Sequence, residues 1–121
     1  MIVALWAGMA VLGGLGATAR FMVDRAVARR VERRFPFGTL TVNISGAVLL
    51  GFIGGLTLSP QAALLVGTAF VGAFTTFSTW MLETHRLAEE RQVKAAAANI
   101  VVSVVLGVAA ALLGQQIAGF V

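Results

Sequence analysis

Polar side chains interrupt long apolar stretches of this sequence at three places. Asn43 lies in the middle of FPFGTLTVNISG (35–46), and Arg20 lies near the end of GGLGATARF (13–21). The motif GAFTTFSTW (72–80) carries four hydroxyl residues, which are Thr75, Thr76, Ser78 and Thr79. Amide and hydroxyl groups donate hydrogen bonds, and a guanidinium group is a permanent cation. Together these groups have the chemistry to bind a small anion.

Asn43 and Arg20 each have a structural interpretation beside the functional one. A buried amide in an apolar segment needs a hydrogen-bond partner, so Asn43 either links two helices or donates to a passing anion. Arg20 either extends its charged end toward a polar interface or raises the local concentration of anions at a pore mouth. The sequence leaves both alternatives open.

The hydroxyl cluster in 72–80 predicts an interrupted helix. Ser and Thr side chains can bond to carbonyls of their own helix, but four of them beside Gly72 are more than that interpretation needs. A break would free backbone carbonyls that could hold a cation, and the hydroxyls could line a path.

Aromatic and amide side chains accompany the cluster. Phe74, Phe77 and Trp80 recur every third residue, near one face of a helix, where they either pack or turn their ring edges toward an anion. Asn99 and Ser103 lie one turn apart in the last apolar run and form a second polar stripe, with a helix contact as the alternative.

The sequence predicts no enzyme. Glu83 and His85 are expected at the end of an apolar run, and His85 cannot form a metal site alone because the chain has no second His and no Cys. No nucleophile–base pair is evident. The glycines of 13–21 are expected within a helix rather than after a strand, so a dinucleotide-binding loop is excluded.

The composition shows what must position these residues. The chain has 121 residues, of which 59% are hydrophobic and 12% charged, whereas soluble domains have about 25% charged residues. The surroundings must therefore be partly lipid. The net charge of +4 does not indicate nucleic-acid binding, because the basic residues lie in two short stretches between apolar runs, where lipid headgroups are the expected contact.

Uncharged runs cover 1–19, 35–82 and 95–121, and the middle run divides at Leu58-Ser59-Pro60-Gln61. A span needs roughly 20 apolar residues, so the chain is predicted to be a single all-α membrane domain. No Lys or Arg precedes the first run, so we expect it to be a retained span rather than a signal peptide. The four spans are expected at 2–22, 37–58, 60–84 and 95–119.

Small residues spaced by four predict close helix packing. They are Ala47, Gly51 and Gly55 in the second span, and Ser103, Gly107 and Ala111 in the fourth. A bundle of this size has little room for an internal cavity, so a transport path is expected to need a second subunit.

The basic residues predict the orientation in the membrane. All nine Lys and Arg residues lie in or beside the connections near 24–35 and 85–94. The N-terminus, the turn at 58–61 and the C-terminus carry none. The positive-inside rule places both connections in the cytoplasm and both termini outside. With a bias of nine to zero, we expect this chain to insert in one orientation.

The motifs at 13–21, 35–46 and 72–79 together resemble the Fluc (CrcB) family of bacterial fluoride channels, in order and spacing over the whole chain. The resemblance implies a passive fluoride channel of the cytoplasmic membrane, formed by an antiparallel dimer with two narrow pores around a structural sodium ion.

The resemblance also implies roles for individual residues. Gly72 and Thr75 match the break whose backbone carbonyls hold the sodium. Arg20 matches a vestibule arginine, and Glu83 an acid at the end of the third span. The residues that match the pore itself are Asn43, Phe77, Ser78 and Thr79.

This chain departs from the family pattern at three positions. Trp80 replaces a second phenylalanine, Ala73 replaces a common glycine, and Asn99 lies where many members have tyrosine. A homodimer of antiparallel copies requires insertion both ways, which the one-sided charge disfavours. We therefore predict a related partner subunit of opposite charge bias.

Two other functions fit a small four-span chain. A small multidrug exporter would need a carboxylate inside a span, whereas the first, second and fourth spans have no Asp or Glu in their apolar stretches and Glu83 lies at an end of the third. A membrane scaffold that transports nothing would leave Asn43 and the hydroxyl cluster without a role.

Overall fold

The computed structural model describes residues 1–31 and 34–121, which form helices and connections without any strand. Four stretches among these residues are long and apolar enough to cross a membrane, at Ile2–Arg30, Phe37–Gly55, Pro60–Glu89 and Val93–Ala118. The predicted all-α architecture with four membrane spans is confirmed. Arg33, which belongs to the first basic connection, lies outside the described residues.

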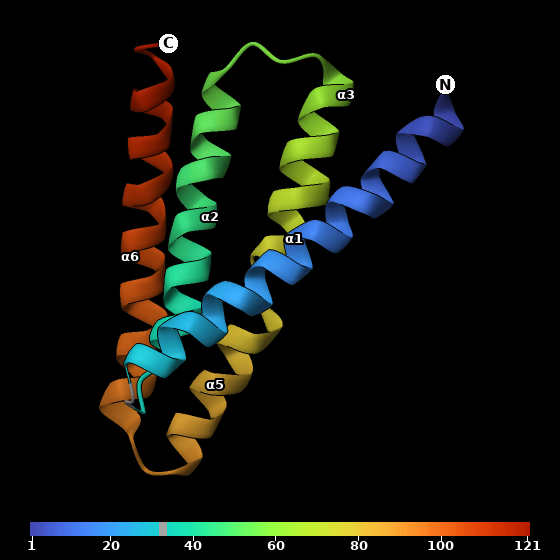
Figure 1. The fold of residues 1–121 in the computed structure, drawn as a ribbon. Helices are drawn as coiled ribbons and strands as arrows, with labels where there is room; N and C mark the ends of the chain where they lie inside the picture. The colour runs from blue at the N-terminus through green and yellow to red at the C-terminus, as the bar shows by residue number, and fades with distance from the viewer. Residues whose placement is uncertain (32–33) are drawn as a thin grey trace.

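The helices lie side by side as a bundle (Figure 1). Helix α1 (Ile2–Arg30) crosses the bundle obliquely, whereas α2 (Phe37–Gly55) and α6 (Val93–Ala118) run alongside each other. Both termini lie at the same end as the connection between α2 and α3 (Pro60–Ala63), and the turn before α6 lies at the opposite end.

Helices α2 and α6 pack most closely, because glycines remove the side chains between them. A Cβ atom at Gly51 would collide with the backbone carbonyl of Ala111, and one at Gly114 would collide with that of Val48. A Cβ at Gly55 would come within 2.7 Å of the Ala118 Cβ. Tight packing was predicted for Gly51, Gly55 and Ala111, and it is present there.

The predicted stripe in α6 makes no close contact within the subunit at Gly107, where a Cβ would meet no atom of the described residues within 4 Å. Gly114 makes the close contact in its place. Spacing by four identifies one face of a helix, but it does not tell which part of that face the neighbouring helix covers.

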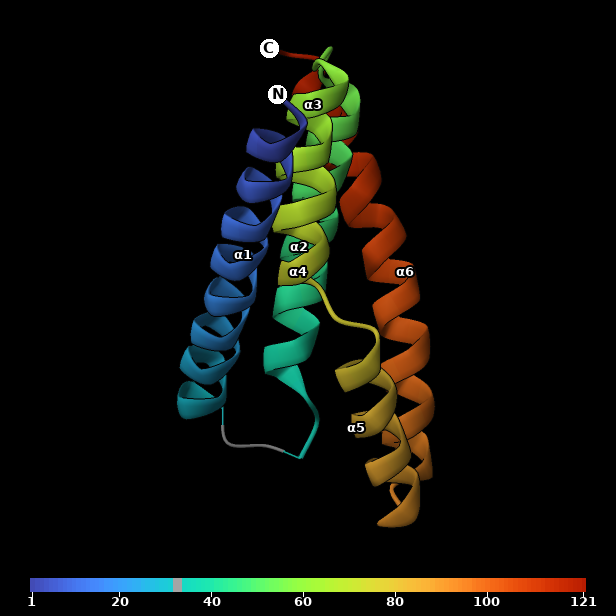
Figure 2. The ribbon, with the colours of Figure 1, turned by 90° about the vertical axis from the view of Figure 1, so that its right-hand side faces the viewer.

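The third span is interrupted, as predicted. Ser59 caps α3 by accepting a hydrogen bond from the Ala62 amide at 3.2 Å, and Pro60 occupies the first turn. The chain continues through a π-helical segment, η1 (Leu64–Val71), and the short α4 (Gly72–Phe74). It then becomes extended at Thr75 (φ −87°, ψ 161°) and returns to helix in α5 (Ser78–Glu89). The extended segment between α4 and α5 is visible in Figure 2.

The turn from α5 to α6 uses a left-handed residue. Arg91 has φ 60°; its amide donates to the Ala88 carbonyl at 3.1 Å, and the Gln92 amide donates to the Leu87 carbonyl at 2.8 Å. These two bonds form a Schellman motif, in which glycine is the preferred left-handed residue.

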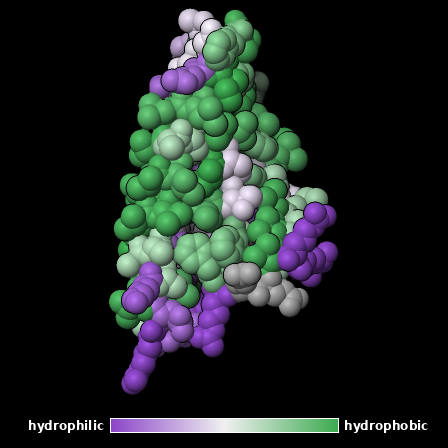
Figure 3. Space-filling model, turned by 90° about the vertical axis from the view of Figure 1, so that its left-hand side faces the viewer, coloured by the Kyte–Doolittle hydropathy of each residue, from purple (hydrophilic) through white to green (hydrophobic). Residues whose placement is uncertain are grey.

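Hydrophobic side chains cover most of the molecular face in Figure 3, and hydrophilic ones gather toward one end. Large apolar side chains are exposed along α1 and α6, including Trp6, Leu15, Val101 and Leu112. Such exposure fits a lipid environment, because so large an apolar surface would be unfavourable in water.

Candidate anion pathway

The interruption of the third span leaves backbone groups without helical partners, and Asn43 takes up two of them. The Thr76 amide donates to Asn43 Oδ1 at 2.8 Å, and Asn43 Nδ2 donates to the Thr76 carbonyl at 2.9 Å. Asn43 therefore makes the interhelical link that was one of its two predicted interpretations.

The same side chain keeps one donor. A primary amide has two N–H bonds, and the described hydrogen bonds use one of them. Asn43 borders two pockets, one of about 330 Å³ with Thr75 and Thr76, and one of about 300 Å³ with Ser103. The structural and functional interpretations of Asn43 are thus compatible.

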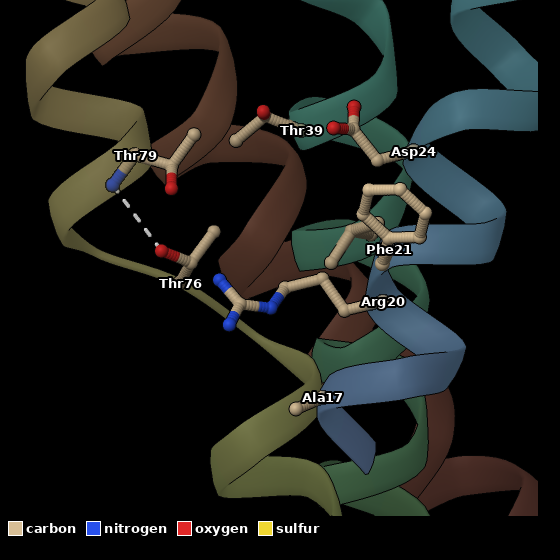
Figure 4. A pocket seen from close by; sticks show the side chains of 8 residues that line it. Ala17, Arg20, Phe21, Asp24, Thr39, Thr76 and Thr79 are labelled. Atoms are coloured by element: carbon tan, nitrogen blue, oxygen red, sulfur yellow. Dashed lines mark hydrogen bonds between the residues drawn. The ribbon is translucent and has the colours of Figure 1, made fainter. Parts of the chain in front are cut away.

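Arg20 lies in a third pocket, of about 260 Å³, between α1, α2 and the start of α5. Figure 4 shows its guanidinium group directed toward Thr76 and Thr79. Thr39, which is 3% exposed, and Asp24 line the same pocket. A fixed cation beside several hydroxyl groups makes this pocket suited to a small anion.

Thr39 was missed by the sequence analysis. It lies one helical turn before Asn43 and belongs to the same motif, so its place on one face of α2 could have identified it.

Two hydroxyl residues of the cluster form hydrogen bonds at the helix ends beside the break, and another lines the Arg20 pocket. Thr75 Oγ1 bonds back to the Val71 carbonyl at 3.0 Å and closes the end of α4. Thr76 Oγ1 accepts from the Thr79 amide at 3.2 Å and so caps the first turn of α5, and it lies 3.5 Å from the Ser78 hydroxyl. The Thr79 side chain faces the Arg20 pocket.

The aromatic residues do not share one face, contrary to the prediction. Phe74 is 6% exposed and stacks on Phe70, with ring centroids 6.1 Å apart. Phe77 is 71% exposed and meets Trp80 edge to face, with centroids 5.7 Å apart. Spacing by three assumes a continuous helix, and the break lies between Phe74 and Phe77.

Asn99 and Ser103 lie one turn apart on the continuous helix α6, as expected, but their side chains have different neighbours. Asn99 is 1% exposed, and its amide donates to Thr84 Oγ1 at 2.8 Å, so it links α6 to α5. Ser103 lines the pocket of about 300 Å³ together with Asn43 and Trp80. Only Ser103 of this pair lies beside Asn43.

The residues expected at a sodium site lie at the break. Among the described hydrogen bonds, no backbone amide donates to the carbonyls of Gly72 or Thr75. Free carbonyl oxygens are suitable ligands for a hard cation. The carbonyl groups of Gly72 and Thr75 therefore fit the sodium ion that the family resemblance implies.

Comparisons with known proteins identify the family of this chain. A profile for the family described as "CrcB-like protein, Camphor Resistance (CrcB)" matches residues 7–115. This chain belongs to the CrcB family. A relative from Mycolicibacterium paratuberculosis, named "Fluoride-specific ion channel FluC 2", is 71% identical over 119 residues, which cover 98% of each chain.

Further relatives of this CrcB chain carry similar names. "Fluoride-specific ion channel FluC 2" of Mycobacterium bovis is 68% identical over 118 residues, or 98% of this chain and 94% of the relative. "Fluoride-specific ion channel FluC 1" of Symbiobacterium thermophilum is 42% identical over 115 residues, or 90% and 93%. The comparisons give no support to an exporter or a scaffold.

A fourth pocket of this CrcB chain, of about 370 Å³, lies where the basic connections meet. Glu83 lines it together with Asp24, Glu90 and the arginines Arg34 and Arg86. Oxygen Oε1 of Glu83 is buried and has no hydrogen-bond partner among the described residues. His85 does not line this pocket. Its Nε2 lies 3.1 Å from Glu89 Oε1 on the exposed side of α5.

Proposed function

We propose that this chain is a subunit of a fluoride-selective passive channel that lets fluoride leave the cell and so reduces its toxicity. The observation that carries this proposal is the 71% identity, over 98% of the chain, to a protein named as a fluoride-specific ion channel. A channel moves an ion without making or breaking covalent bonds, so no catalytic residue is assigned.

The pathway begins at the Arg20 pocket. The guanidinium group attracts anions, and the Thr79 and Thr76 hydroxyls lie beside it. From there the ion passes the break and reaches Asn43, whose second Nδ2–H is available. Fluoride is small and strongly hydrated, so these donors replace its water, and the edge of Phe77 adds a weak positive field. Chloride is larger and matches such a narrow site poorly.

A structural sodium ion at the break is the second part of the proposal. Gly72 and Thr75 would hold it through their carbonyl oxygens, and the ion would offset the negative ends of carbonyl dipoles there. Two carbonyl oxygens do not complete the coordination shell of the ion, so the same residues of a second subunit are proposed to supply further ligands.

The second subunit is proposed to lie antiparallel to the first. Pockets beside Asn43 open at the side of this bundle rather than inside it, which supports a path completed by a partner. Because all nine basic residues lie in or beside the two connections expected on the same side of the membrane, the partner is proposed to be a homologous subunit of opposite charge bias. The basic connections are placed in the cytoplasm and the termini outside.

Fluoride efflux from liposomes that contain the purified chain tests the function, with chloride efflux as the control. Selective fluoride release by the chain alone would establish a self-sufficient channel and refute the obligate partner. Release that requires co-expression of a homologous subunit would establish both the channel function and the need for a partner. No release in either case would refute the channel.

A further inference from the structure

The indole ring of Trp80 is held by a hydrogen bond to the neighbouring helix. Its Nε1–H donates to the backbone carbonyl of Asn99 at 3.0 Å, and the ring also packs edge to face with Phe77. A helix carbonyl has two lone pairs, so Asn99 can accept from the indole while it keeps its place in α6.

A buried network holds this carbonyl in position. The Asn99 amide donates to Thr84 Oγ1 at 2.8 Å, and Thr84 Oγ1 donates to the Trp80 carbonyl at 2.8 Å. The three residues thus form a closed loop between α5 and α6. Asn99 is 1% exposed, so water has little access to the Asn99 side of these part-buried bonds.

Trp80 borders both of the pockets that Asn43 lines. The pocket of about 330 Å³ includes Phe77 and Thr76, and the pocket of about 300 Å³ includes Ser103. Trp80 and Asn43 line both. An ion that moves from one pocket to the other along Asn43 must therefore pass the indole ring.

We propose that the Asn99 carbonyl immobilises the Trp80 ring, and that the immobilised ring limits the rate at which fluoride passes Asn43. Asn99 is then a positioning residue and Trp80 the limiting one. This inference rests on the proposed channel function. Phe77, being mostly exposed, lacks such a restraint.

The restraint is tested by nuclear magnetic resonance in the Trp6→Phe variant, which leaves Trp80 as the only indole. An order parameter of the indole N–H near the value of about 0.85 typical of a rigid backbone is expected. A value below about 0.6 would overturn the restraint. This measurement does not depend on transport.

The limit on flux is tested in liposomes with Trp80 replaced by its benzothienyl isostere, which has sulfur in place of the indole N–H and nearly the same shape. Loss of one hydrogen bond is expected to raise fluoride efflux roughly fivefold, with chloride still excluded. The same isostere at Trp6, which has no hydrogen bond to the described residues, is the matched control. Trp80→Phe gives an independent variant with a smaller ring.

Each outcome decides one part of the inference. Unchanged or slower efflux in the isostere would overturn the limiting role of the ring. Efflux by the variant when the original chain shows none would support it. If no form of the chain passes fluoride, either alone or with a co-expressed homologous subunit, the flux claim falls with the channel function, and the order parameter still decides the restraint.

Discussion

Replacing Asn43 by leucine is expected to destabilise the fold at the break in the third span. The substitution removes both bonds to Thr76, at 2.8 and 2.9 Å, and leaves the Thr76 amide and carbonyl without partners. Leucine has a similar volume, and the adjoining pockets leave it room. Loss of hydrogen bonding is therefore the dominant effect.

The magnitude follows from two lost bonds. A hydrogen bond between helices in a membrane contributes about 0.6–1.7 kcal/mol, and a buried group left without a partner costs about 1–3 kcal/mol. We expect Asn43→Leu to lower the free energy of unfolding by about 2–3 kcal/mol. Fluoride efflux should also fall, because the donor to the ion is lost.

The assay is equilibrium unfolding in detergent micelles, followed by circular dichroism. Thr41→Val is the matched control: Thr41 lies on the same helix and is exposed, and among the described residues its hydroxyl bonds only to the Phe37 carbonyl of its own helix. The control should stay within about 0.5 kcal/mol of the original chain. An equally small change for Asn43→Leu would refute the conclusion that the two hydrogen bonds of Asn43 to Thr76 stabilise the break in the third span.

Three further changes test other parts of the structure. Gly51→Ala should destabilise the chain by about 1–3 kcal/mol because its Cβ meets the α6 backbone, whereas Gly54→Ala, with open space, should be neutral or stabilising in the same unfolding assay. Arg91→Gly should raise the free energy of unfolding by about 1 kcal/mol, because glycine adopts φ 60° without strain; a loss of stability would contradict this. Arg20→Gln should slow fluoride efflux most at low ionic strength, where charges are least screened; a salt-independent effect would argue against electrostatic attraction.

The sequence by itself determined the class of the molecule and the course of its chain. Hydropathy adds along the chain, so the apolar runs predict four membrane spans without any knowledge of packing. Local signals were equally reliable: Ser59 and Pro60 mark the start of the third span, and the hydroxyl cluster marks its break.

Tertiary structure alone decided which polar groups meet. Asn43 and Thr76 are 33 positions apart, and only the packing of α2 against the break makes them partners. For Asn99 and Ser103 the sequence left open a polar stripe or a helix contact, and only the fit of α5 against α6 shows that Asn99 makes the helix contact while Ser103 lies at a pocket. The physical reason is that burial in lipid depends on each residue's own transfer free energy, whereas a hydrogen bond depends on the position of two groups to within a few tenths of an ångström.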